Sequence, residues 1–221
     1  MSEGNKLQQC AEILLCFCLD FSAHRAAQIT YHRYRLVAEY YDHFRTLLTE
    51  MSLSEEKMKL LSEHKGDIQV IHDRSRCRWC QSKIRGVVKE NPPVFSVQCG
   101  SSGTVTIDPL NDDEAAMFGS QKEHSDASRG YVGFICCGKF HRFAGIGGLK
   151  DSAEKQWAWI LERVHARYGI WKHNTGYYLK ELEWKYNNRS LDPDLQAQKI
   201  IGFMPADFLT AWLDKEAIEG T

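Results

Sequence analysis

Two adjoining segments near the C-terminal end, within residues 151–189, constrain the fold of this chain most strongly. In the first, DSAEKQWAWILERVHARYGI, apolar side chains recur three and four positions apart, which predicts an amphipathic helix. Asp151 is suited to cap its start and Gly169 to end it. In the second, YYLKELEWKYNNR, aromatic and leucine side chains recur four apart, which predicts another helix. Each helix has an apolar face to bury, and both are expected to cover a sheet.

The composition limits the partners of the chain. A chain of 221 residues, 43% of them hydrophobic, suits one large domain or a small head plus a domain. Its net charge of −1 gives no global basic field, so a nucleic-acid surface must be a local patch. The start MSEGNKLQQ is polar and carries no secretion signal, so we expect an intracellular protein, nuclear in a eukaryotic host, with free thiols. The longest apolar run, ILLCFCL, is too short to cross a bilayer, and no membrane partner is expected.

The N-terminal residues 7–50 are predicted to be helical throughout. A helix that is apolar nearly all round is followed by a short helix, AHRAAQI, which Ser22 caps, and by a long helix, YRLVAEYYDHFRTLLTEM. Three helices with a tight middle connection form the helix-turn-helix pattern. His32, Arg33 and Arg35 would lie at the front of the third helix, where such modules read the major groove of DNA. A plain helical bundle is the alternative interpretation.

The spacing of apolar residues along the chain changes after Gly66, from a helical to a strand-like pattern. IQVIHD, IRGVVKE and VFSVQCG are predicted strands, GTVTIDP continues the sheet, NDDEAAMFGS is a short helix, and KEHSD is a further strand before the large helices. This order is that of a ribonuclease-H-like fold, an α/β (α+β) domain with a mixed sheet flanked by helices. The predicted organisation is a helical head (1–50), a linker (51–66), a ribonuclease-H-like domain (67–190) and a C-terminal helical tail (191–221).

Four segments of the chain, in this order, match one family. They are the helical run from Leu7 to Leu48, HSDASRGY around Asp126, DSAEKQW around Glu154, and YLKELEWKYNNR. The chain resembles the Merlin-type DDE transposases and the related transposases of bacterial insertion sequences. The resemblance implies a helical DNA-binding head, a ribonuclease-H-like catalytic domain, DNA cleavage and strand transfer, and a homo-oligomer that acts on paired DNA ends.

The resemblance also implies a metal site. Enzymes of this type use two divalent ions, about 3.5–4 Å apart, for in-line attack at phosphorus. Mg²⁺ or Mn²⁺ binds carboxylate oxygens, and the resemblance implies that Asp126 is the second acid of the site and Glu154 the third. Each acid has a plainer interpretation. Asp126 could cap a helix after a strand, and Glu154 could complement a helix dipole.

Two departures from the family pattern concern this site. Ile71 stands where the family has its first acid, and Asp73 is the nearest replacement, because residues two apart in a strand point to the same face. Only 28 positions separate Asp126 from Glu154, which is shorter than the family gap. A catalytically dead, domesticated DNA-binding protein is therefore the alternative function.

The pair Cys77 and Cys80 has metal-ligand spacing. A structural zinc site needs four ligands, and the remaining cysteines form no second pair of this spacing, so we expect free thiols rather than zinc. A zinc-stabilised interaction module remains the second alternative. Cys10, Cys16 and Cys18 lie on an apolar helix and are predicted core residues.

A basic patch is predicted near the end of the first C-terminal helix. Arg163, Arg167 and Lys172 stand there among aromatic residues. A solvated helix end favours cations, which is the plainer interpretation. In a transposase the same residues would contact DNA phosphates beside the active site.

Overall fold

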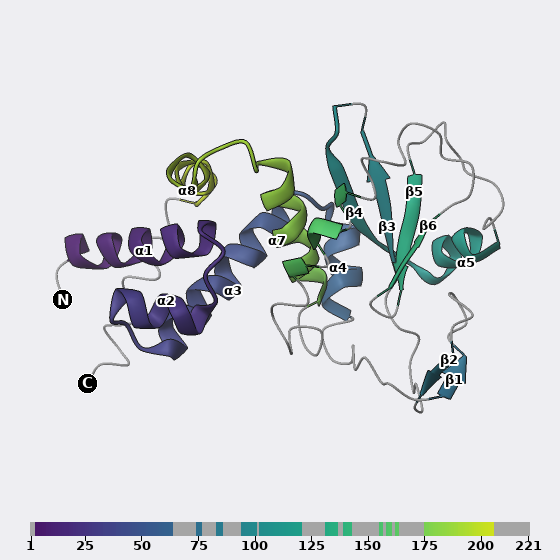
Figure 1. Cartoon of the computed structure of the whole chain (residues 1–221), viewed down its shortest axis with the longest axis horizontal. Coiled ribbons are helices and arrows are strands. Elements are labelled where there is room, and N and C mark those ends of the chain that lie inside the picture. The colour runs from purple at the N-terminus through teal and green to yellow at the C-terminus, as the bar shows by residue number, and fades with distance from the viewer. Residues whose placement is uncertain are drawn as a thin grey trace. The chain divides into compact units, whose positions relative to one another are not determined.

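The structure is a computed structural model, and it describes residues 3–63, 74–76, 83–85, 94–100, 102–120, 131–136, 139–142, 155–156, 158–160, 162–163 and 175–205. The chain divides into two compact units (Figure 1). Unit 1 comprises Met1–Met51 and Asn188–Thr221, and unit 2 comprises Ser52–Asn187. The fold is mixed α/β, with a helical head and a sheet, as the sequence predicted at this level. Among the described residues, no helix combines the length and apolarity needed to cross a membrane.

Unit 1 is helical. Its described helices are α1 (Glu3–Cys18), α2 (Ala23–Thr30), α3 (Tyr34–Glu50) and α8 (Pro193–Ile201). The ring of Phe17 in α1 lies edge-on against Tyr41 and Phe44 of α3, with centroid separations of 5.1 and 5.4 Å. All three rings are buried, so aromatic packing joins α1 to α3. Cys10, Cys16 and Cys18 are buried on α1, which confirms them as core residues.

Local capping sets two helix starts in unit 1. The Ser22 hydroxyl accepts from the Arg25 N–H at 3.2 Å and caps α2, as predicted. The Asp192 carboxylate accepts from the Leu195 N–H at 2.8 Å, and Pro193 follows in the first turn of α8. The tail that contains α8 belongs to the same compact unit as the head, since α8 packs on α1.

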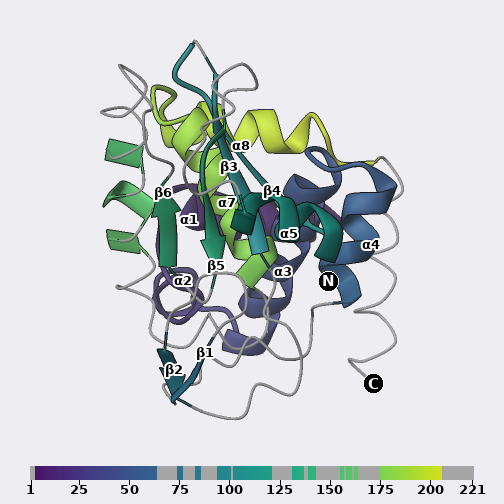
Figure 2. The same cartoon turned by 90° about the vertical axis from the view of Figure 1, so that its right-hand side faces the viewer.

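Unit 2 contains a four-stranded antiparallel sheet in the order β4-β3-β5-β6 (Figure 2). The strands are β3 (Val94–Cys99), β4 (Val105–Leu110), β5 (Tyr131–Cys136) and β6 (Lys139–Arg142). A separate two-stranded pair joins β1 (Arg74–Arg76) to β2 (Lys83–Arg85). The described strands pair only in antiparallel fashion, so the parallel pairing of a mixed sheet is not among them. The ribonuclease-H-like arrangement remains a prediction.

The sequence correctly predicted β3, β4 and α5 (Asp112–Ser120) but missed β5 and β6. The apolar run YVGFIC forms β5, which lies next to β3 inside the sheet. Such a run predicts a strand that is buried on both faces, and this signal was available. The predicted strands IQVIHD and KEHSD lie outside the described residues.

Two helices of unit 2 pack beside β4, namely α4 (Glu55–Glu63) and α7 (Thr175–Asn187). Helix α4 comes from residues 51–66, which the sequence predicted to be a linker, and its Leu61 is buried in the core of unit 2. Gly176 makes the close approach of α4 to α7 possible, because a Cβ there would lie 1.9 Å from Leu61 Cδ1. Residues 52–63 therefore belong to the packed domain.

Candidate functional site

The connection between α2 and α3 is the strongest candidate site among the described residues. Helix α2 ends at Thr30, and the residue that follows, Tyr31, has a left-handed backbone (φ 58°, ψ 26°). Arg33 is extended (φ −62°, ψ 134°) and precedes the first residue of α3. Three residues, Tyr31 to Arg33, thus join the two helices, which is the tight connection of a helix-turn-helix unit. The sequence predicted this turn.

Exposed basic and aromatic side chains gather at this connection. We define the α2–α3 corner by its exposed polar and aromatic side chains, which are His24, Arg25, Gln28, Tyr31, Arg33, Tyr34 and Arg35. Tyr31 is 94% exposed and Tyr34 is 58% exposed. The Arg35 side chain is 87% exposed, and its Nε donates to Glu39 at 3.0 Å. The corner therefore presents three guanidinium groups and two phenols, which are donors suited to phosphate oxygens.

His32 lies differently from Arg33 and Arg35. Its ring is half-buried, its Nδ1 lies 3.2 Å from Gln9 Nε2 on α1, and its Nε2 lies 3.9 Å from the Glu12 carboxylate. His32 therefore joins the turn to α1 instead of extending outward with the arginines. Its position near the start of α3 was predicted from the sequence, but the packing of α1 decides the direction of its side chain.

Tyr31, Tyr34 and Arg25 were missed as candidate site residues. The segment AHRAAQITYHRYR is dense in basic and aromatic residues, and this density was a usable signal. The sequence did not indicate that Tyr31 and Tyr34 are exposed, because an amphipathic pattern assigns aromatic side chains to a buried face.

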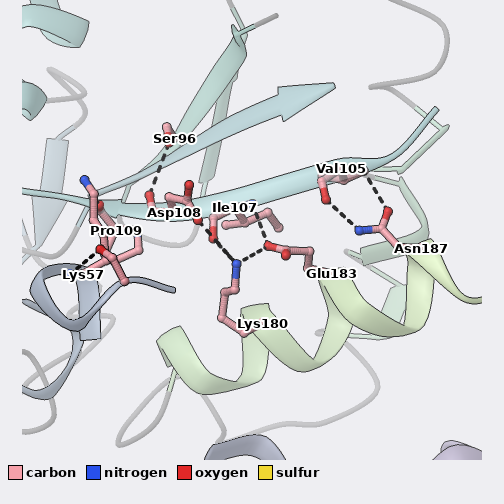
Figure 3. A network of polar contacts seen from close by, with 10 residues as sticks. Lys57, Ser96, Val105, Ile107, Asp108, Pro109, Lys180, Glu183 and Asn187 are labelled. Carbon is pink, nitrogen blue, oxygen red and sulfur yellow. Dashed lines mark hydrogen bonds and ion pairs between the residues drawn. The ribbon is translucent and has the colours of Figure 1, made fainter. Parts of the chain in front are cut away.

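The segment YLKELEWKYNNR forms most of α7, and its polar side chains bind the backbone of β4 (Figure 3). Lys180 Nζ donates to the Ile107 carbonyl at 3.1 Å and to the Glu183 carboxylate at 2.6 Å. Glu183 in turn accepts from the Ile107 N–H at 2.7 Å. Asn187 bonds both the N–H and the carbonyl of Val105. These groups hold the outward-facing edge of β4.

Burial governs the electrostatics of this network. Burial raises the pKa of Glu183 above its ordinary value of 4.5, while the charge and hydrogen bond of Lys180 and the Ile107 N–H lower it less. Asp108 adds a smaller raising effect and lies 3.4 Å from Lys180 Nζ. On the same helix, Lys185 pairs with Glu181 at 2.8 Å, and both are buried. The charges of α7 are thus structural, because they are bonded within the fold.

The Arg163 side chain packs against an aromatic ring of unit 2. Its guanidinium carbon lies 3.6 Å from the centroid of the Trp159 ring, which is a stacked cation–π contact. The Trp159 ring lies edge-on to Tyr186 of α7, at 5.4 Å. Arg163 therefore packs on an aromatic surface, and Arg167 and Lys172 of the same predicted patch lie outside the described residues.

The predicted metal ligands lie outside the described residues. These are Asp73, Asp126 and Glu154, together with Ile71 at the first-acid position and Cys77 and Cys80 of the zinc alternative. Within the described ranges, no three His, Cys, Asp or Glu side chains gather as a metal-binding group. The Cys99 thiol is buried and donates to Gln156 Oε1 at 3.2 Å, so this cysteine belongs to the packing of β3.

Comparison with known proteins adds no relative. No family model matches the chain, and no similar curated protein or solved structure was found.

Proposed function

We propose that this chain is a DDE-type DNA transposase or a protein derived from one, and that its helical head binds duplex DNA through the α2–α3 corner. The observation that carries the proposal is the exposure of Arg33 and Arg35 at the start of α3, directly after a three-residue turn. In helix-turn-helix proteins the first residues of the second helix contact base edges in the major groove.

The charges of the corner support a nucleic-acid partner. Arg25, Arg33 and Arg35 are exposed on a chain whose net charge is only −1, so the positive charge is local. Guanidinium groups bind phosphates, and they also form paired hydrogen bonds to guanine. His32 contributes by holding the turn against α1 through Gln9.

The test of DNA binding uses the full chain and fluorescence anisotropy of a labelled duplex. We expect Arg33→Ala or Arg35→Ala to weaken binding by about tenfold. Each should also reduce the slope of log K against log salt concentration by about one, because one phosphate contact is lost. Lys59→Ala is the matched control, because it removes one exposed positive charge from α4. Equal losses in all three variants, or binding that ignores salt, would exclude the corner as the interface.

The proposed catalytic step is metal-dependent cleavage and transfer of DNA strands. Asp126 and Glu154, with Asp73 in place of the first acid, would hold two Mg²⁺ or Mn²⁺ ions. We expect Asp126→Ala and Glu154→Ala each to abolish Mn²⁺-dependent DNA cleavage while the far-UV circular dichroism stays unchanged. Retained cleavage in either variant would remove that residue from the site.

Ile71 favours a second candidate, a DNA-binding protein that has lost the chemistry. An isoleucine cannot supply a metal ligand where the family has its first acid. In that case the wild-type chain binds DNA with a steep salt dependence and cleaves no substrate with either ion. The two assays, binding and cleavage, separate these candidates.

A further inference from the structure

Tyr31 combines two unfavourable features at one position. Its backbone is left-handed (φ 58°), a conformation in which a side chain crowds the following carbonyl and which glycine usually adopts at helix ends. Its side chain is also 94% exposed, so the ring buries almost no apolar area. The free-energy cost of this backbone conformation is therefore not offset by burial of the Tyr31 side chain.

Two other residues of unit 1 share only one feature each with Tyr31. Asp20 also has a positive φ (61°), but it is a short polar residue of the kind that tolerates this conformation. Tyr41 is a buried tyrosine whose hydroxyl donates to the Phe21 carbonyl at 3.0 Å. Tyr31 has neither the tolerant side chain of Asp20 nor the burial of Tyr41.

The position of Tyr31 within the corner indicates what its side chain contacts. In helix-turn-helix binding, the first helix crosses the DNA backbone and the second enters the groove, so the turn between them lies near the phosphates. Arg33 and Tyr34 follow on the exposed start of α3. The neighbouring guanidinium groups complement an anionic partner, and a phenol hydroxyl can donate to a phosphate oxygen.

We propose that Tyr31 is a DNA-contact residue whose hydroxyl donates a hydrogen bond to a backbone phosphate of duplex DNA. The inference rests on the proposed DNA binding by the α2–α3 corner. It adds a contact to the DNA backbone that does not depend on the base sequence. Tyr31 then lowers the stability of the free protein and strengthens its complex with DNA.

The experiment measures thermal stability and DNA affinity in the same full-length variants. Two unrelated labelled duplexes of about two helical turns serve as probes. We expect Tyr31→Gly to raise Tm by roughly 2–4 °C, because glycine removes the strain, and to weaken binding by about tenfold on both duplexes. Tyr31→Phe keeps the ring but lacks the hydroxyl. It should leave Tm near the wild-type value and lose a similar factor in affinity.

Phe203→Ala is the matched control, because Phe203 is a 47% exposed ring of unit 1 outside the corner. Its affinity for both duplexes should equal that of the wild type. Wild-type affinity in Tyr31→Phe would overturn the inference. If Arg33→Ala weakens binding but both Tyr31 variants bind normally, only the Tyr31 contact fails. If the wild-type chain binds neither duplex, the proposed function itself fails.

Discussion

Asn187 of α7 satisfies both outward-facing backbone groups of Val105 in β4. Its Oδ1 accepts from the Val105 N–H and its Nδ2 donates to the Val105 carbonyl, each over 2.8 Å. Strand β4 ends the four-stranded sheet, so these groups have no neighbouring strand among the described residues. The side chain of one helical residue thus takes the place of a strand and protects a sheet edge.

The same relationship repeats along β4. Glu183 and Lys180 bond the N–H and the carbonyl of Ile107, and Lys57 of α4 donates to the Pro109 carbonyl at 2.8 Å. Four helical residues rise about 6 Å and two strand residues rise about 6.7 Å, so Asn187 and Glu183 match alternate strand positions. Pro109 needs no partner for an N–H, which suits an edge strand.

Removing the Asn187 side chain should destabilise unit 2. Asn187→Ala leaves the Val105 N–H and carbonyl without their partner, and we expect a loss of about 1–3 kcal/mol in the free energy of unfolding. Asn187→Asp keeps the acceptor but places a second oxygen against the Val105 carbonyl, so it should also destabilise. Urea denaturation measures both. Wild-type stability in Asn187→Asp would show that the bond to the carbonyl contributes nothing.

Glu183 should make stability depend on pH in a defined direction. Since burial raises its pKa above 4.5, the folded protein holds this proton more tightly than the unfolded chain does. Its contribution to stability is therefore largest at low pH and decreases as the pH rises from about 4.5 through the folded pKa. Glu183→Gln carries a neutral side chain like the protonated acid, so we expect the wild type to lose stability relative to Glu183→Gln as the pH rises toward neutrality.

Urea denaturation of both proteins at a series of pH values tests this. At low pH the two proteins should have similar free energies of unfolding, and near neutral pH Glu183→Gln should be the more stable. A wild type that is the more stable near neutral pH would mean that the ion pair with Lys180, and not burial, dominates the pKa of Glu183.

Gly176 should tolerate a side chain poorly. A Cβ at this position would lie 1.9 Å from Leu61 Cδ1 and 2.9 Å from its Cγ, so in Gly176→Ala the buried Leu61 side chain must move or α4 and α7 must separate. We expect a loss of about 1–3 kcal/mol, measured by urea denaturation. In Gly202→Ala the new Cβ would meet its nearest atom at 3.5 Å, so this control should stay close to the wild type. Equal effects in the two variants would rule out the contact with Leu61 as the cause.

Cys10 should resist alkylation in the folded protein. Burial raises the pKa of its thiol to about 11, so at pH 8 only about one molecule in a thousand carries the reactive thiolate. Iodoacetamide labelling, followed by mass spectrometry of the Cys10 peptide, should be slow in buffer and fast in urea. The stabilising effect of the buried thiol is complete below pH 9 and is lost as the pH rises toward 11. Similar rates in buffer and urea would contradict this burial.

Local sequence was sufficient for most helices and for two strands. Ser22 and the apolar period after it predicted α2, and the alternating residues of VFSVQC predicted β3. The catalytic assignments of Asp126 and Glu154 depend on the family resemblance and not on a local pattern. They stay predictions, because the residues lie outside the described part of the chain.

The local sequence pattern indicates strands β5 and β6 only weakly. The apolar run of β5 is consistent with a buried strand or a buried helix segment, and pairing with β3 across more than thirty residues decides between them. The exposure of Tyr31 was likewise undecidable from the sequence, because the direction of a turn depends on the packing of α1 against α3.

The sequence by itself determined where helices form in unit 1, where α7 lies in the chain, and that Ser22 caps α2. Only the tertiary structure decided that the charges of α7 are buried. A helix rich in Lys and Glu predicts a solvated face, but Lys180, Glu183 and Asn187 bond groups more than seventy residues away. The unpaired backbone of an edge strand needs those partners, and no local period records that need.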